Sequence, residues 1–335
     1  MALDRDLGVA FVRALDRRLG AGWEATAATG VRGLRLLRET SSFDSFLFTE
    51  TSPRSFEVLQ ANVAGDARAR AERRDSAGPA LDGAAFDYVD VDPYGSPLRF
   101  LGSAIAATRP GGILAVTATD LPVLAGAQPA ACRRLYGAEP VRGRLGPEGA
   151  LRILLATLDG RARAGGRGLR PLLAYVGGHH VRAYVELAPS VPGDAPVGTI
   201  DPGRWDGPPI SGRAPVGPLW TGPLVAPEIA ARLTVPSTAA RPRELERFLA
   251  LLREEVEVVR PFYYEANLLA GRLGLARPPR LGDLLRELRE LGYRAARTHV
   301  RPEGVRTDAP RSVVEAAART ASARAAQSQN ARVRA

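Results

Sequence analysis

Apolar residues in the first half of the chain alternate between helical and strand-like spacing. Leu7 to Leu19 and Ser55 to Val63 carry apolar residues three and four positions apart, which predicts helices. Phe46 to Thr51, Phe86 to Val91 and Gly112 to Thr119 are short apolar runs, which predict buried strands. This rhythm is typical of βαβ units that form a mostly parallel sheet with helices on both faces.

Two further apolar runs, Arg170 to Val176 and Val181 to Leu187, are separated only by Gly177 to His180. A connection that short can join two strands only as an antiparallel hairpin. A parallel sheet that ends in such a hairpin resembles the methyltransferase variant of the doubly wound α/β fold. We therefore expect a Rossmann-like class I methyltransferase domain.

The second half of the chain changes character at Ser190 to Pro218, a stretch rich in Pro and Gly that predicts a long connecting loop. Beyond it, helical spacing is followed by two strand-like segments. Helices followed by a small β-wing predict an α+β, winged-helix-like domain, which often presents basic side chains to nucleic acid. The predicted helices are Pro242 to Glu257, Tyr263 to Leu273 and Leu281 to Leu291, and the predicted strands are Tyr293 to Val300 and Gly304 to Thr307.

Composition adds a basic character to this picture. The chain has 335 residues, a net charge of +10, and 46 basic residues, all of them arginine. This charge suggests a polyanionic partner such as nucleic acid, although a solvated basic surface in an arginine-biased sequence explains it equally well. One cysteine and three histidines leave little for a disulfide framework or a metal centre, so we expect no metal. No apolar run is long enough for a membrane span, and we expect a cytoplasmic protein without membrane contact.

The strongest chemical motif is the run Asp90-Val91-Asp92-Pro93-Tyr94, which ends a predicted strand. Ligands bind at this edge of an open α/β sheet. The exocyclic amine of a nucleobase is a poor nucleophile because its lone pair is delocalised into the ring. The Asp92 carboxylate and the Pro93 carbonyl could each accept one of its N–H groups, and the Tyr94 ring could stack on the base. The plainer alternative is a capped turn before a helix.

A second motif favours a bound nucleoside cofactor. Glu24 to Arg35 reads as a strand, a turn containing Thr29 and Gly30, and a helix start, where backbone can approach a ligand. Glu50 ends the next strand at about the interval expected of a ribose-binding carboxylate. The two glycines of this segment, Gly30 and Gly33, could also belong to an ordinary tight turn.

With these residues in place, the chain resembles the tRNA (guanine-26, N2)-dimethyltransferase family, archaeal type. The similarity runs from about Ala2 to Val313. It rests on four phrases in the family's order: DVDPYGSP from Asp90, GGILAVTATD from Gly111, PVGPLWTGPL from Pro215 and RTHVRPEGVRTDAP from Arg297. Tyr94 replaces a usual Phe, and Glu50 replaces a usual Asp.

The resemblance implies an enzyme that uses S-adenosyl-L-methionine to methylate the N2 amine of guanine in tRNA, with a methyltransferase domain and an additional C-terminal tRNA-binding domain; we expect a monomer. The changes in composition along the chain predict the bounds: a methyltransferase domain at 1–190, a connecting segment at 191–235, a tRNA-binding domain at 236–313 and a disordered basic tail at 314–335. It also implies catalytic and ligand-binding positions. Asp92 falls at the catalytic carboxylate, and the family's cofactor positions are occupied by Arg5, Arg32, Glu50, Asp75 and Ser76. The motifs themselves add Pro93 and Tyr94 to catalysis, and Thr29, Gly30 and Asp90 to the cofactor site.

Four basic side chains on the predicted wing are candidates for phosphate contacts, although a merely solvated basic face explains them as well. They are Arg294, Arg297, His299 and Arg306. The family carries an upstream segment with a Phe-Tyr-Asn-Pro phrase that covers cofactor and base, and Met1 aligns just after it, so we expect a longer natural chain. Two other functions stay open: methylation of another exocyclic amine in tRNA or rRNA, and tRNA binding without catalysis.

Overall fold

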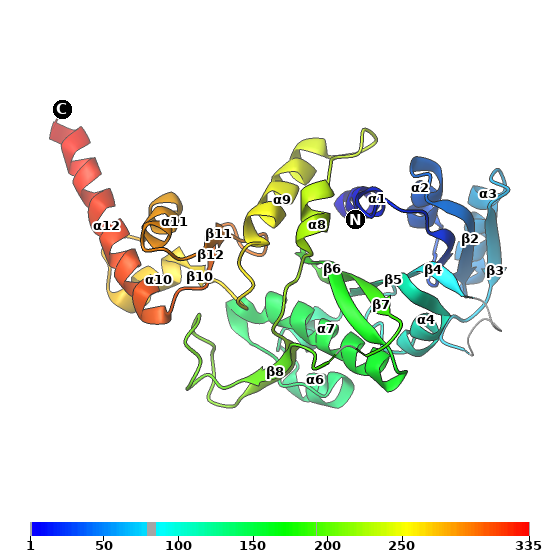
Figure 1. Cartoon of the computed structure of the whole chain (residues 1–335), viewed down its shortest axis with the longest axis horizontal. Helices are drawn as coiled ribbons and strands as arrows, with labels where there is room; N and C mark the ends of the chain where they lie inside the picture. Colours follow the sequence, from blue (N-terminus) through cyan, green and yellow to red (C-terminus); the bar gives the residue numbers. More distant parts are fainter. Residues whose placement is uncertain (1, 79–84, 192, 335) are drawn as a thin grey trace.

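A seven-stranded sheet forms the centre of the larger part of the molecule (Figure 1). The computed structural model describes residues 2–78, 85–191 and 193–334. The strand order is β3-β2-β1-β4-β5-β7-β6, and only β7 runs antiparallel to its neighbours. The strands are β1 (Gly20–Glu24), β2 (Phe43–Glu50), β3 (Ala69–Arg73), β4 (Phe86–Val91), β5 (Thr108–Ala118), β6 (Gly168–Gly177) and β7 (His180–Ala188). The predicted α/β class and the terminal hairpin are confirmed.

Helices cover both faces of this sheet and give it two apolar cores. One core includes the buried sides of α1 (Ala2–Ala14), α2 (Val31–Glu39), α3 (Pro53–Val63), α8 (Pro227–Arg232) and α9 (Pro242–Glu255). The other includes α4 (Leu101–Ala107), α5 (Leu121–Leu124), α6 (Pro129–Tyr136) and α7 (Gly146–Ala164). Because strands buried on both faces need apolar residues at every position, their sequences lack the alternation of a half-exposed strand.

The Pro- and Gly-rich stretch is more regular than its composition indicated. It contains the antiparallel pair β8 (Val197–Ile200) and β9 (Val216–Trp220), where we had expected only a loop. Leu219 and Trp220 are buried against the core on the α7 side, and the Trp220 indole donates to the Pro223 carbonyl at 2.9 Å. Burial of these two side chains stabilises a pairing that local propensity does not favour.

A separate small unit lies at the C-terminal end, beside α9 and away from the large sheet (Figure 1). It has its own apolar core and a three-stranded antiparallel sheet in the order β10-β12-β11. Its elements are β10 (Tyr264–Glu265), α10 (Ala266–Leu273), α11 (Leu281–Glu290), β11 (Ala295–Arg297), β12 (Gly304–Thr307) and α12 (Arg311–Arg334). This matches the predicted α+β type.

The boundaries of this unit differ from those expected at 236 and 313. The apolar face of α9, formed by Leu245, Leu249 and Leu252, packs in the core that contains α1, because residues four and seven apart share one helix face. At the other end, α12 continues past Val314, and its buried alanines reach Ala321 in the C-terminal core. The expected tail is therefore helical and packed over its first part, since small side chains permit close contact with α11.

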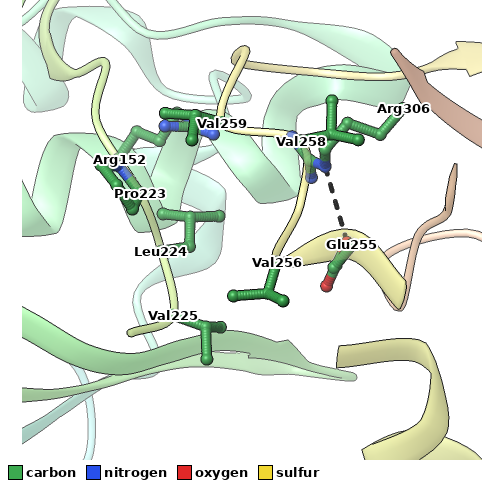
Figure 2. A pocket seen from close by; sticks show the side chains of 9 residues that line it. All are labelled: Arg152, Pro223, Leu224, Val225, Glu255, Val256, Val258, Val259 and Arg306. Carbon is green, nitrogen blue, oxygen red and sulfur yellow. Dashed lines mark ion pairs between the residues drawn. The ribbon is translucent and has the colours of Figure 1, made fainter. Parts of the chain in front are cut away.

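A buried ion network joins α7 to the C-terminal unit. The Glu148 carboxylate accepts from Arg152 at 2.7 Å, from both terminal nitrogens of Arg306 at 2.9 Å, and from the backbone N–H of Phe262 at 2.8 Å. Arg306 also lies 3.5 Å from Glu255, the last residue of α9 (Figure 2). The charges of Arg306 and Arg152 overcome the opposing effect of burial and lower the pKa of Glu148 to about 2. The seam between the two parts is thus held by buried charges that are paired with one another.

Candidate active site

A cavity of about 410 Å³ opens at the carboxyl ends of the parallel strands. Its size is within the range of small-molecule sites. Residues that follow β1, β2, β3 and β4 meet there, because the carboxyl ends of parallel strands share one edge of a sheet. The lining residues are Ala25, Thr26, Ala28, Glu50, Thr51, Ser52, Ser55, Arg74, Asp75, Ser76, Asp92, Pro93, Tyr94, Arg99 and Phe100.

The turn from Asp92 to Ser96 forms one wall of this cavity, directly after β4. Gly95 has a φ of +81°, a conformation that favours glycine, and it allows the chain to reverse there. Tyr94 projects from the turn and is 96% exposed, which leaves a whole ring face free for stacking. The three residues expected to act on an amine therefore lie together at the cavity rim.

The Asp92 carboxylate is held in place by Arg32, whose terminal nitrogen lies 2.5 Å from Asp92 Oδ2. The Asp92 side chain is 21% exposed, so it remains accessible from the cavity. Although burial opposes ionisation, the nearby guanidiniums of Arg32 and Arg182 lower the pKa of Asp92. The carboxylate is consequently an anion near neutral pH, with its second oxygen free of this ion pair.

Asp90 lies beneath the site and does not line the cavity, which differs from its expected contact with the cofactor. It is 1% exposed, and its Oδ2 accepts from Arg182 at 2.5 Å and from the Tyr88 hydroxyl at 2.8 Å. Since side chains alternate across a strand, Asp90 lies on the same face of the sheet as Tyr88, while its carbonyl accepts from the Ala25 N–H at 2.8 Å. Asp90 and Arg182 therefore form a buried support for the turn after β4.

Glu24 ends β1 next to this cluster, and among the residues that the structure describes no basic side chain lies at hydrogen-bonding distance from it. Its Oε2 accepts the backbone N–H of Gly33 at 3.0 Å. Burial, reinforced by the charge of Asp90, raises the pKa of Glu24 to about 8. The carboxyl is therefore mostly protonated at neutral pH, unlike Asp92 a short distance along the same sheet edge.

The wall opposite the turn carries two carboxylates that suit a nucleoside. Glu50 lines the cavity and accepts from the backbone N–H groups of Ala28, Thr51 and Ser52 at 2.8–2.9 Å. A carboxylate has about four acceptor sites, so one remains for a ribose hydroxyl. Asp75 also lines the cavity and pairs with Arg99 at 2.6 Å. These donors and acceptors fit the ribose and the base edge of a nucleoside cofactor.

Ser76 lines the same wall but is 5% exposed, and its hydroxyl lies 2.7 Å from that of Thr49. Its side chain therefore fixes the strand ends rather than pointing into the cavity. Arg5, on α1, is half-buried and lies outside the cavity lining, as do Thr29 and Gly30. Of the eight residues expected at the cofactor, Glu50, Asp75 and Ser76 border the cavity. Arg32 does not border it but pairs with Asp92, which does.

The glycines of the first turn serve packing in this structure, where close approach to a ligand had been expected. A Cβ on Gly30 would lie 2.6 Å from Leu59, and Gly30 has a φ of +75°. A Cβ on Gly33 would lie 2.5 Å from Phe48 and 2.8 Å from Glu24. Both positions face the helix–sheet interface, so they let α2 lie close against β2.

Two of the four residues expected to bind RNA are buried. Arg306 is 2% exposed because β12 places Val305 in the C-terminal core and therefore turns Arg306 toward Glu148. The His299 side chain is fully buried; its Nε2 accepts from the Val176 N–H at 3.1 Å and its Nδ1 contacts Glu255. Arg294 and Arg297 are exposed, although Arg297 pairs with Glu254 at 2.5 Å. Of these four side chains, only Arg294 and Arg297 are exposed to solvent.

Other side chains of uncertain role have structural partners. Trp220, Tyr263 and Tyr264 are buried, as expected for packing. His180 Nε2 lies 2.8 Å from Asp4 Oδ1, whereas His179 is exposed in the hairpin turn. Within the described parts of the chain, no helix has the length and apolarity to cross a membrane, and no group of three or more His, Cys, Asp or Glu is placed to hold a metal ion.

Sequence reasoning missed three contributors to the site. Thr26 Oγ1 accepts the Asp92 N–H at 2.9 Å, and Arg182 supports Asp90 from β7. Phe100 lines the cavity after the turn. The position of Thr26 at the end of β1 could have suggested it, because β1 and β4 are neighbours in this fold. Nothing local marks Arg182, which is 92 residues from Asp90.

Comparison with known proteins identifies a matching protein family. A model of the N2,N2-dimethylguanosine tRNA methyltransferase family matches residues 1–193 and 211–319. A tRNA (guanine(26)-N(2))-dimethyltransferase of Thermococcus kodakarensis is 35% identical, with 94% of this chain and 90% of that protein covered. The enzyme of the same name from Pyrococcus furiosus is 33% identical, with 93% and 89% covered. Trm1 from Pyrococcus horikoshii, solved with S-adenosyl-L-methionine, has a TM-score of 0.82 and 28% identity over 95% of this chain and 92% of that one.

Proposed function

The chain belongs to the N2,N2-dimethylguanosine tRNA methyltransferase family, and on that premise we propose that it methylates the N2 amine of guanine 26 in tRNA with S-adenosyl-L-methionine. The observation that carries this proposal is the Asp92–Ser96 turn at the rim of the cavity that Glu50 and Asp75 border. Two successive transfers to the same nitrogen would give the dimethylated base. We further propose that it acts in the cytoplasm as a monomer.

The cavity fits the cofactor by the chemistry of its donors and acceptors. Glu50 would accept from one ribose hydroxyl, and Asp75 would accept from the adenine amine. Arg32 contributes indirectly by holding Asp92. When bound, S-adenosyl-L-methionine supplies an electrophilic methyl group on a sulfonium. The acidic wall of the cavity favours that positive charge.

Catalysis by this chain would consist of holding the amine and stabilising charge. Asp92 and the Pro93 carbonyl would each accept one N–H of the guanine amine, which fixes its orientation and draws electron density toward the nitrogen. Tyr94 would stack on the base once it leaves its helix, a contact of about 1–3 kcal/mol in single-strand binders. As the methyl group leaves the sulfonium and bonds to nitrogen, positive charge develops there, and the ionised Asp92 would stabilise it and accept the proton that the amine loses.

The lowered pKa of Asp92 sets the expected pH dependence. An acceptor that must be ionised works above its pKa and fails when protonated. Because Arg32 and Arg182 depress the pKa of Asp92, its ionisation should limit activity only below the ordinary range of an aspartate. Loss of Arg32 would move the acidic limb of the kcat profile toward higher pH.

We propose that the C-terminal unit positions the tRNA. Arg294 and Arg297 are exposed on its sheet side and could contact phosphate. An Arg294→Ala, Arg297→Ala double variant is expected to weaken tRNA binding at all sequences and to reduce its salt dependence, because phosphate contacts release counterions. Arg306 offers an internal comparison, since its loss should lower stability instead.

The full chain, a tRNA transcript and labelled S-adenosyl-L-methionine test the activity, with nucleoside mass spectrometry to identify the product. Methyl transfer should occur at guanine 26 and disappear when that position is adenine. Asp92→Ala should lower kcat by about 100-fold or more. Asp44→Ala is the matched control, because Asp44 is the second residue of β2, at the end of the strand away from the cavity, and is 63% exposed.

Each alternative has its own outcome in this assay. Product at a different guanine, or in rRNA only, would assign the chain to another exocyclic-amine methyltransferase. Binding of tRNA without calorimetric heat from S-adenosyl-L-methionine would leave a tRNA-binding protein without catalysis. Equal activity of Asp92→Ala and the wild type would remove the proposed role of the turn.

A further inference from the structure

The Asp92–Ser96 turn is tied to the sheet at both of its ends. At its start, Asp92 donates its backbone N–H to Thr26 Oγ1 at 2.9 Å. At its end, the Gly95 N–H donates to Thr119 Oγ1 at 2.6 Å, and the Thr119 N–H donates to the Gly95 carbonyl at 3.0 Å. These bonds fix the backbone of the turn against β1 and β5.

A third attachment runs through side chains and leaves the turn on the far side from the cavity. Ser96 Oγ lies 2.8 Å from the Tyr136 hydroxyl, which in turn lies 2.8 Å from Asp120 Oδ2. A tyrosine hydroxyl has one proton, and an ionised carboxylate can only accept. Tyr136 therefore donates to Asp120 and accepts from Ser96. The Ser96 hydroxyl also interacts with the Asp120 carboxylate, so the three groups form a directed chain closed by this second contact.

The middle member of this chain is held rigidly. Tyr136 is the last residue of α6, is 7% exposed, and packs its ring in the core on the α7 side of the sheet. Burial raises the pKa of its hydroxyl, so Tyr136 keeps its proton and remains a donor. Asp120 lies two residues after β5 and directly before α5. Tyr136 and Asp120 are thus anchored to elements that do not belong to the turn.

We propose that Tyr136 and Asp120 are positioning residues for methyl transfer, which fix Ser96 and thereby the directions of the Pro93 carbonyl and the Tyr94 ring. The inference rests on the proposed function of the turn. Neither residue borders the cavity, so neither contacts cofactor or base there. Their effect would be on the geometry of the bound amine, where small displacements are costly.

Tyr136→Phe removes only the hydroxyl and keeps the buried ring. It should lower kcat about 10-fold, the effect of one lost hydrogen bond, while the Kd values for S-adenosyl-L-methionine and tRNA stay within about twofold. Tyr263→Phe is the matched control: it removes a buried hydroxyl that donates to the Arg144 carbonyl at 2.7 Å, at the seam with the C-terminal unit. Both variants should unfold at similar urea concentrations, but only Tyr136→Phe should have a lowered kcat for methyl transfer.

Coupling between the members gives a second readout. Ser96→Ala should lower kcat to the level of Tyr136→Phe, and the double variant should be no slower than either, because one break already releases the turn. Asp120→Asn retains an oxygen that accepts from Tyr136 and should stay within about threefold of the wild type. Asp120→Ala should resemble Tyr136→Phe.

Several outcomes would overturn the inference. A Tyr136→Phe variant with the kcat of the wild type would overturn the positioning role. So would losses of kcat that multiply in the Ser96→Ala, Tyr136→Phe double variant, or a loss of activity that only follows a loss of stability. If the wild-type chain itself transfers no methyl group to tRNA, the proposed function fails and the positioning role fails with it. Methyl transfer by the wild type with an equally fast Tyr136→Phe would overturn the positioning role alone.

Discussion

Replacement of Glu148 by alanine tests the buried seam between α7 and the C-terminal unit. The carboxylate is fully buried and compensates two guanidiniums, those of Arg152 and Arg306. Glu148→Ala leaves both positive charges buried without it, and breaking a buried pair in this way costs about 3–5 kcal/mol. The pKa of Glu148, about 2 against an ordinary 4.5, independently corresponds to about 3 kcal/mol.

Urea denaturation followed by circular dichroism measures this loss. Glu139→Ala is the control, because Glu139 pairs with Arg133 at 2.6 Å on the surface, where such pairs contribute under about 1 kcal/mol. Adding Arg306→Met to Glu148→Ala should recover part of the stability, since the second change removes one of the two uncompensated charges.

The sign of the pH dependence follows from the lowered pKa. The contribution of Glu148 is complete above about pH 4.5 and is lost as the pH falls toward 2, so the wild type and Glu148→Gln should converge in acid. A Glu148→Ala variant no less stable than Glu139→Ala would refute the view that buried charge holds the seam.

Glu24 should have the opposite pH behaviour: with a pKa near 8, it makes the wild type less stable as the pH rises from about 4.5 to 8. Glu24→Gln should remove this pH dependence, and at pH 8 the variant should be more stable than the wild type by roughly 3–5 kcal/mol. Urea denaturation at pH 4.5 and pH 8 measures the two free energies of unfolding. The same change in stability with pH in both proteins would contradict the prediction. Gly33→Ala should cost about 1–3 kcal/mol because the new methyl meets Phe48, whereas Gly102→Ala on α4, with no atom within 4 Å, should be neutral or slightly stabilising. Thermal melts of this pair decide whether close packing or ligand approach requires Gly33. Replacing Arg182 by methionine should leave Asp90 buried without its partner and lower both stability and kcat; an active variant of wild-type stability would show that this support is dispensable.

Local sequence was sufficient for the elements whose signals are short-range. Phe86 to Val91 is an apolar run stopped by Asp92-Pro93, and the structure gives that strand the same bounds. The hairpin of β6 and β7 followed from the length of its connection. The Asp92–Ser96 turn could be placed at the ligand-binding edge because that edge is a property of parallel sheets.

Contacts between distant residues decided what local patterns left open. Arg306 and Arg297 are similar in sequence context, yet one pairs with buried Glu148 and the other lies at the surface. Helix α9 reads as part of a C-terminal domain, but its leucines pack with α1.

The sequence by itself determined the α/β class, the terminal hairpin, the turn after β4 and the family, because each depends on spacing or on contiguous residues. Only the tertiary structure decided which carboxylates are ionised. Glu24 and Asp92 both end parallel strands, but burial beside Asp90 keeps Glu24 protonated while Arg32 keeps Asp92 charged. A pKa depends on the distance to other charges and to water, and neither distance is written in the local sequence.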